Sequence, residues 1–394
     1  MVALTDSGKK ALDAVVERLD RERKMPGFVL GATTAKEEVY FNSGGNKVVD
    51  DPTSDKVGPE AVFWICSMTK LIAHIAALQL IDQGKLTADT PVSEIFPQFA
   101  NLVIVDNIMF PNPNPNPTFK PATNIMLVKH LLNFSSGLFY PWTQDFGYVA
   151  PHAYLGVHDT KDPHAIIYGY GSDLLGFIVE KITVKTLDEY LQENVFKPLN
   201  ITASFYLTGA LRKNLLPLTL RTPEGQMHFW KNQPGTAIIE QDPGKVSHHF
   251  GGIGLYTSLR DYLKLLRHLL QILEVKADRP VLTKKAVESL FIGTHNDEGV
   301  KNLSMVVNLA FPGQTCQWSS ALAATTEDWE NRRKKGCAFW SGWAGTHFFI
   351  DPRTGVAAVY GTQLLAPTCG NNDPENLKGF VAFEEALYAG LDKN

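Results

Sequence analysis

The amino-acid sequence predicts an α+β fold, with an antiparallel sheet flanked by terminal helices and an inserted, mostly helical domain. Strand-like segments occur near both ends of the chain, whereas helical periodicity dominates the middle. Strands from distant segments can join one sheet, and the helices between them then form a second layer. We therefore expect residues 1–60 and 291–394 to form the sheet domain and residues 61–290 the helical domain. A cleft between the two is the natural place for chemistry.

Each end of the chain combines one helical pattern with two strand-like runs. The helical patterns place apolar side chains three or four residues apart, and the strand-like runs are short and apolar. They predict a helix over 7–23, strands at 28–32 and 39–41, strands at 346–350 and 356–360, and a helix over about 375–391.

The middle of the chain begins with a helix that is apolar on nearly every face, from near Ser67 to a capping glycine at position 84. A helix of this kind is expected to be buried. Further helical patterns occur at 126–133, 173–183, 187–197, 258–272 and 284–291. Over 110–119, alternating proline and asparagine exclude a helix or a central strand, so we expect an exposed loop. A lid or a partner-binding tract is the alternative for this loop.

Composition excludes several classes of protein. A net charge of −4 over 394 residues gives no reason to expect nucleic acid or an anionic membrane as a partner. The N-terminus shows no secretory signal, and no apolar stretch is long enough to span a membrane. The four cysteines form no CxxC pair, so we expect reduced thiols in a cytoplasmic protein. No cofactor or metal is expected, because His248, His249 and His347 lack further clustered ligands.

Ser67 and Lys70 form an S-x-x-K motif at the start of the buried helix. Residues i and i+3 share a helix face, so the lysine amine can reach the serine hydroxyl. A serine becomes a good nucleophile when a base takes its proton, and an uncharged lysine is such a base. For the motif alone, a capping serine beside a lysine that extends to solvent is the alternative.

Two further segments complete the candidate site. The Gly-rich segment 168–176 contains Tyr168 and Tyr170, either of which could relay a proton or simply pack. Residues 339–346 combine small and aromatic side chains before a strand. A backbone amide there can form half of an oxyanion hole, with the Ser67 amide as the other half. The alternative is a strand start with aromatic packing.

At these three places the sequence resembles the class C β-lactamase-like serine esterases and transesterases, and most closely the fungal acyltransferases of the lovastatin type. The resemblance extends over about residues 10–390 and includes the segments 82–89, 130–138 and 251–261. It implies a β-lactamase/transpeptidase-like fold with the active site between the sheet and the helices.

The resemblance also implies roles for individual residues. Ser67 is the residue acylated, and Lys70 and Tyr168 form the base system. Tyr168 is favoured over Tyr170 because it begins the family pattern Y-G-x-x-x-D-x-x-G. The match of Trp340–Trp343 to the lactamase K-T-G strand assigns the second oxyanion amide to Trp343.

Two departures from true β-lactamases argue against antibiotic hydrolysis. Those enzymes have asparagine two residues after the catalytic tyrosine and lysine in the strand motif, where this sequence has Tyr170 and Trp340. The lost groups help to recognise the lactam, and their aromatic replacements predict an apolar pocket. Its expected substrate-binding residues are Trp340, Ser341, Gly342, Tyr170, Phe139, Tyr140 and Trp142.

The predicted function is acyl transfer from an ester or thioester of a hydrophobic, natural-product-type substrate to an alcohol, through an acyl-enzyme on Ser67. Hydrolysis of the same esters by a carboxylesterase is one alternative. Another is isomerisation or cyclisation with Lys70 and Tyr168 as acid and base, and a non-catalytic binding protein is the least favoured. The expected partners are small molecules. The basic run 332–335 predicts a solvated turn or, alternatively, a docking place for an acyl carrier protein.

Overall fold

The computed structural model describes residues 2–105, 119–138, 156–158, 168–230, 240–308, 310–365 and 373–392. Its helices are α1 (Asp6–Glu22), α2 (Thr69–Asp82), α3 (Val92–Ile95), α4 (Val128–Leu132), α5 (Gly171–Thr183), α6 (Leu187–Leu191), α7 (Lys197–Leu199), α8 (Gly209–Asn214), α9 (Leu259–Leu273), α10 (Lys284–Glu288), α11 (Asp297–Asn308) and α12 (Pro374–Gly390). Its strands are β1 (Phe28–Thr34), β2 (Glu38–Gly44), β3 (Val62–Trp64), β4 (Val103–Val105), β5 (Phe119–Pro121), β6 (Gly156–His158), β7 (Ala203–Ser204), β8 (Thr219–Arg221), β9 (Met227–Phe229), β10 (Tyr256–Ser258), β11 (Cys316–Trp318), β12 (Ala323–Thr325), β13 (Ala338–Gly342), β14 (Thr346–Asp351), β15 (Val356–Gly361) and β16 (Leu364–Leu365).

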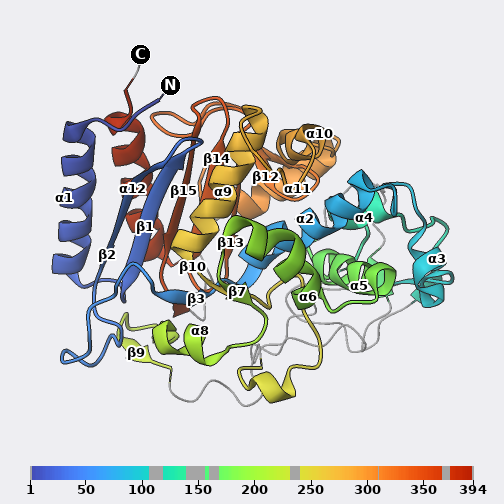
Figure 1. Cartoon of the computed structure of the whole chain (residues 1–394), viewed down its shortest axis with the longest axis horizontal. Helices are drawn as coiled ribbons and strands as arrows, with labels where there is room; N and C mark the ends of the chain where they lie inside the picture. The colour runs from blue at the N-terminus through green and yellow to red at the C-terminus, as the bar shows by residue number, and fades with distance from the viewer. Residues whose placement is uncertain are drawn as a thin grey trace.

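A seven-stranded sheet in the order β11-β12-β13-β14-β15-β1-β2 joins the two ends of the chain (Figure 1). Every neighbouring pair in it is antiparallel. The central pairing of β1 with β15 places Leu30 opposite Tyr360. The predicted α+β class, with an antiparallel sheet built from both terminal segments, is therefore confirmed.

Helices cover both faces of this sheet. α1 and α12 lie side by side on one face, and α9 packs on β1 and β15 (Figure 1). Alternate residues of β1 separate the two cores, with Leu30 packing towards Leu12 of α1 and Val29 packing in the core that contains Leu263 of α9. α9 lies within residues 61–290 although it packs on the sheet. The domain boundaries proposed from the sequence stay a prediction.

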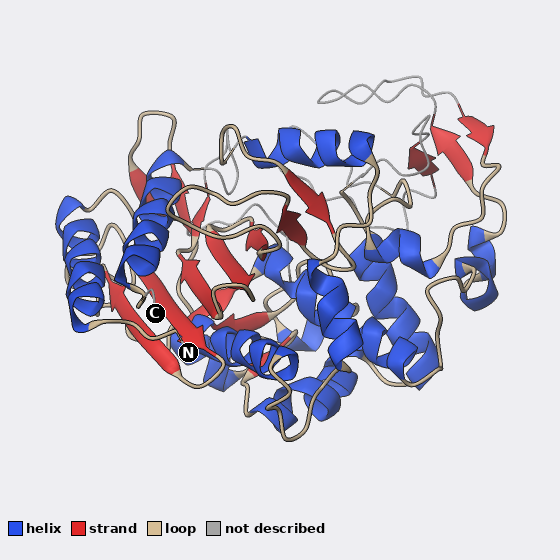
Figure 2. Ribbon diagram, turned by 90° about the horizontal axis from the view of Figure 1, so that it is seen from above, coloured by secondary structure: helices blue, strands red, loops and turns tan. Residues whose placement is uncertain are grey.

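α2 packs against α5 (Figure 1). Both belong to the helix-rich part of the molecule, which lies beside the sheet (Figure 2). Residues 69–80 are all buried, which confirms the burial expected from an apolar helix. Gly84 follows the helix with a φ of 68°, a left-handed conformation that suits a capping glycine. Among the described residues, every helix is too short or too polar to span a bilayer.

Short strands that the sequence did not predict hold the beginning of α2 in place. β3 pairs with β10, and Trp64 lies opposite Tyr256. At the end of β3, the Trp64 N–H donates to the side chain of Gln363 at 3.0 Å. The chain therefore enters α2 from an anchored strand. Of the proline-asparagine loop, residues 110–118 lie outside the described residues, and Phe119 begins β5.

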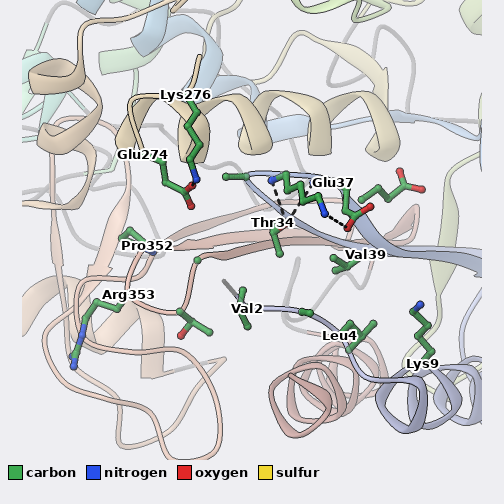
Figure 3. Close-up of a pocket in the computed structure, with 16 residues that line it drawn as sticks. Val2, Leu4, Lys9, Thr34, Glu37, Val39, Glu274, Lys276, Pro352 and Arg353 are labelled. Carbon is green, nitrogen blue, oxygen red and sulfur yellow. Dashed lines mark hydrogen bonds and ion pairs between the residues drawn. The ribbon is translucent and has the colours of Figure 1, made fainter. Parts of the chain in front are cut away.

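The structure shows a cavity of about 530 Å³ between the start of the chain, the β1–β2 hairpin, the end of α9 and the β14–β15 turn (Figure 3). Val2, Thr34, Lys276 and Arg353 are among its lining residues. The cavity lies at the end of β14, whereas the small-residue segment singled out from the sequence lies at the start of that strand. The two places are therefore separated by the length of a strand.

The basic run 332–335 is not a solvated turn throughout, and that expectation is wrong for Arg333. Arg333 is fully buried and donates hydrogen bonds of 2.7 and 2.8 Å to the buried carboxylate of Glu384 on α12. Arg332 also approaches Glu384, at 3.4 Å. The rings around the Arg333 guanidinium belong to Phe311, Trp329, Phe339, Phe349 and Phe380. Both charges can be buried because each compensates the charge of the other.

Candidate active site

Ser67 lies in a one-turn 3₁₀ segment, Cys66–Met68, that connects β3 to α2. Cys66 has a φ of 48°, an uncommon conformation for a residue with a side chain. The Met68 N–H donates to the Ile65 carbonyl at 3.0 Å and closes the turn. Ser67 is partly exposed, while Cys66 and Met68 are buried. The tight turn therefore presents the serine side chain at the N-terminus of a buried helix.

Lys70 extends from the first turn of α2 towards Ser67. Its side chain is almost fully buried, with 1% of the residue exposed. The Nζ atom lies 3.1 Å from Ser67 Oγ and donates to the Gly252 carbonyl at 2.8 Å. The structure thus brings together the two residues of the S-x-x-K motif, as residues three apart on a helix allow.

Tyr168 lies next to the Lys70 amine. The Nζ atom lies 4.7 Å from the centre of the Tyr168 ring, so the amine lies over that ring. The Tyr168 hydroxyl accepts a hydrogen bond of 3.1 Å from Nε1 of Trp340 on β13. Residues from α2, from the segment before α5 and from β13 therefore meet at one place, although they are up to 270 positions apart in the sequence.

An aromatic cluster that sequence reasoning missed surrounds Tyr168. The centre of the Tyr168 ring is 5.2 Å from that of the Phe134 ring and 5.3 Å from that of the Trp340 ring. Trp318 on β11 completes the cluster, at 4.9 Å from Phe134 and 4.6 Å from Trp340. Phe134 falls in the segment 130–138 noted for its family resemblance, but no local pattern marks Trp318.

The segment between β13 and β14 lies against the Ser67 turn. A Cβ atom on Gly342 would come within 2.5 Å of the Ile65 carbonyl oxygen, so only glycine allows this close approach. The backbone N–H groups of Ala344 and Trp343 lie near the Cys66 thiol, beside Ser67. The segment therefore lies beside the turn that carries Ser67, and the oxyanion-hole role of the Trp343 amide stays a prediction.

The remaining predicted substrate-binding residues have different environments. Trp340 and Ser341 are partly exposed at the end of β13. Tyr170 is only 5% exposed, and burial raises the pKa of its hydroxyl. Phe139, Tyr140 and Trp142 lie outside the described residues.

Cys66 and His249, two further titratable side chains near the site, are both buried. Burial raises the pKa of the Cys66 thiol to about 12, so this cysteine is not a second nucleophile. His249 contacts Glu180 and the Tyr206 hydroxyl, each at 2.9 Å. Within the described part of the chain, no group of three or more histidine, cysteine or acidic residues is arranged to hold a metal ion.

Two buried histidines predict a loss of stability in mild acid. Burial lowers the pKa of His74 from 6.5 to about 4 and the pKa of His347 to about 3. Between these values and pH 6.5, the unfolded chain binds protons that the native protein excludes. The free energy of unfolding should therefore fall with decreasing pH from about 6.5 to 4, by about 1.4 kcal/mol per pH unit for each histidine.

Denaturant titrations of the wild type and of His74→Gln across this pH range would test the expectation. The slope of unfolding free energy against pH should be shallower in the variant by about 1.4 kcal/mol per unit. Identical slopes would show that His74 does not exclude a proton in the native state.

Comparisons with known proteins show similarity over nearly the whole chain. Residues 12–378 match the Beta-lactamase family. The chain is 24% identical to ML-236A carboxylate methylbutanoyltransferase of Penicillium citrinum, over 96% of this chain and 94% of that protein. It is 26% identical to lovastatin esterase of Penicillium rubens, over 88% and 91% of the two chains. Among solved structures, a mutant of simvastatin synthase from Aspergillus terreus superposes with a TM-score of 0.81, at 24% identity and over 98% and 95% of the two chains.

Proposed function

Because the chain belongs to the β-lactamase family, we propose that it is a serine acyltransferase that forms an acyl-enzyme on Ser67. The observation that carries the proposal is the meeting of Ser67, Lys70 and Tyr168 at the start of a buried helix. The donor would be an ester or thioester, and the acceptor an alcohol on a hydrophobic natural product. Two similar proteins whose names describe methylbutanoyl transfer support this class of substrate.

In the proposed acylation step, Lys70 accepts the Ser67 proton, since its Nζ atom is already 3.1 Å from Oγ. Oγ attacks the acyl carbonyl, and the backbone amides of Ser67 and Trp343 stabilise the oxyanion. Tyr168 then passes a proton to the leaving group. In the second half of the reaction, an alcohol gives its proton to Tyr168 and attacks the acyl carbonyl. The bond to Ser67 Oγ breaks, and Lys70 returns its proton to that oxygen.

Trp340 supports the proposed role of Tyr168. An indole N–H can only donate, so the Tyr168 oxygen accepts from Trp340 and its own proton points elsewhere. True β-lactamases have a lysine at this position, which would bring a positive charge to the phenol. The neutral indole instead extends an aromatic wall, which suits an apolar substrate rather than a lactam carboxylate.

Incubation with a panel of acyl thioesters, followed by intact-mass spectrometry, tests the proposal. The wild type should gain one acyl group, whereas Ser67→Ala should gain none. Ser320→Ala, which changes a buried serine away from the proposed nucleophile, is the matched control and should still be acylated. Wild-type protein that turns over a substrate without ever carrying a Ser67 adduct would contradict the acyl-enzyme route.

Hydrolysis of the same acyl-enzyme is the second candidate, and the similarity to lovastatin esterase favours it. The two functions differ only in whether an alcohol or water takes the acyl group. Product analysis with a labelled ester and increasing alcohol separates them. Transfer predicts that the acylated alcohol accumulates at the expense of the free acid, whereas an esterase yields the free acid throughout.

We further propose small-molecule acyl donors and a cytoplasmic location. The buried free thiols Cys66, Cys316 and Cys337 support a reducing compartment.

An acyl carrier protein as donor finds less support, because Arg333 and Arg332 in the proposed docking run are engaged with Glu384. A carrier-bound acyl group that acylates Ser67 much faster than the corresponding small thioester would reverse this preference.

A further inference from the structure

The carbonyl that holds the Lys70 amine belongs to a loop inserted between two helices. Gly252 O accepts the 2.8 Å hydrogen bond from Lys70 Nζ. The preceding residue, Gly251, lies so close to both helices that a Cβ atom there would come within 2.5 Å of the Ser172 carbonyl and 2.9 Å of the Ala73 side chain. The loop can therefore approach Lys70 only because residue 251 is glycine.

Asp173 holds this loop from the other side. Its carboxylate is fully buried in the first turn of α5, and Oδ1 accepts the Gly252 N–H at 2.8 Å. Gly252 is thus fixed at both of its polar groups, by Asp173 at the N–H and by Lys70 at the carbonyl. A hydrogen bond to a carboxylate is stronger than one between neutral groups, so this contact is well suited to fix the loop.

The first turn of α5 has an independent attachment to α2. The His74 Nδ1 atom faces the Ser320 carbonyl at 2.8 Å, so it carries the ring proton. Nε2 then accepts from the Ser172 hydroxyl, also at 2.8 Å. Removing the Asp173 carboxylate would therefore release Gly252 while α5 stays attached to α2.

We propose that Asp173 is a positioning residue for acylation, which sets the Lys70 amine against Ser67 by holding Gly252. The inference rests on the proposed function of Ser67 and Lys70. An uncharged amine has N–H groups to donate and one lone pair to accept a proton, and an N–H donated to the Gly252 carbonyl holds Nζ where the lone pair can face Ser67 Oγ. A displacement of about 1 Å in such a group can reduce a rate about 100-fold.

The test compares three variants by single-turnover acylation with a nitrophenyl ester, followed as adduct mass on Ser67. Asp173→Ala should lower the acylation rate constant about 30-fold, with the ester concentration at half-saturation changed less than about threefold. Asp173→Asn keeps an oxygen that can accept from Gly252 and should recover to within about fivefold of the wild type. The matched control is Asp188→Ala.

Asp188 is a suitable control because, like Asp173, it is a buried residue on a helix whose carboxylate holds a neighbouring segment of the chain in place. Its Oδ1 accepts from the Phe205 N–H at 2.9 Å and from the Ser204 hydroxyl at 2.8 Å. Among the described residues, the Asp188 carboxylate accepts hydrogen bonds from Ser204, Phe205 and Gln192, none of which belongs to the proposed active site. Asp188→Ala should therefore lower the thermal midpoint without a selective loss of acylation rate.

Three results would overturn the inference. Asp173→Ala could acylate as fast as the wild type, Asp173→Asn could be as slow as Asp173→Ala, or Asp188→Ala could lose as much acylation rate at equal loss of thermal stability. Each of these presupposes a wild type that is acylated on Ser67. If the wild type carries no adduct on Ser67, the proposed function itself fails, so the two failures are distinguishable.

Discussion

Replacing Lys70 with methionine is expected to slow acylation of Ser67 by about 1,000-fold, within the range that general bases contribute. Methionine fills a similar volume in the buried site but offers no group to take the serine proton. The affinity for the ester should change much less. Lys70 contacts Ser67, Gly252 and Tyr168 at the reacting centre, so it is not expected to contact the rest of the substrate. Single-turnover acylation with a nitrophenyl ester measures both quantities.

Lys70→Arg provides the matched control for charge. Arginine keeps a positive charge and donors for the Gly252 carbonyl, yet it does not give up its proton in proteins. If Lys70 is the base, the arginine variant should be as slow as the methionine variant. Recovery of acylation by arginine would mean that the site needs a cation rather than a base at this position.

Replacing Glu384 with glutamine is expected to lower the free energy of unfolding by about 3 kcal/mol or more. Glutamine has almost the same shape but leaves the guanidinium of fully buried Arg333 without its compensating charge. Aromatic rings fill the rest of that environment and cannot replace a carboxylate. Urea denaturation followed by tryptophan fluorescence measures the change.

Two further variants test whether the isolated charge causes this loss. Arg333→Met combined with Glu384→Leu removes both charges and should recover most of the stability lost in Glu384→Gln. Glu288→Gln breaks an ion pair between Glu288 and Lys284, and both of these side chains are 49% exposed. This variant should leave the free energy of unfolding nearly unchanged. A double variant as unstable as Glu384→Gln would assign the loss to packing rather than to charge.

Local patterns predicted the elements that local forces determine. Helical spacing identified α1, α5, α9 and α12 because each buries one apolar face, whereas α2 was identified by a run that is apolar on nearly every face. The i, i+3 spacing of Ser67 and Lys70 predicted their contact, because helix geometry fixes it. The strands β3 and β10 escaped prediction, since three residues are too few to show a period.

The basic run 332–335 shows where a local reading fails. Four consecutive cationic side chains are typical of a solvated turn, yet Arg333 is buried against Glu384, 51 positions later in the sequence. Only the folded chain brings that carboxylate to the run. Phe134 and Trp318 escaped notice for the same reason, because their contact with each other depends on packing between distant segments.

By itself, the sequence determined the α+β class, the buried helix and the nearness of a serine and a lysine three residues apart where that helix begins. These follow from periodicity and from spacing within a few residues. Tertiary structure alone decided that Tyr168 covers Lys70, that Trp340 donates to its hydroxyl and that Asp173 holds the loop facing the amine. The physical reason is that such contacts join segments about 80 to 180 positions apart, whose meeting depends on how the whole core packs.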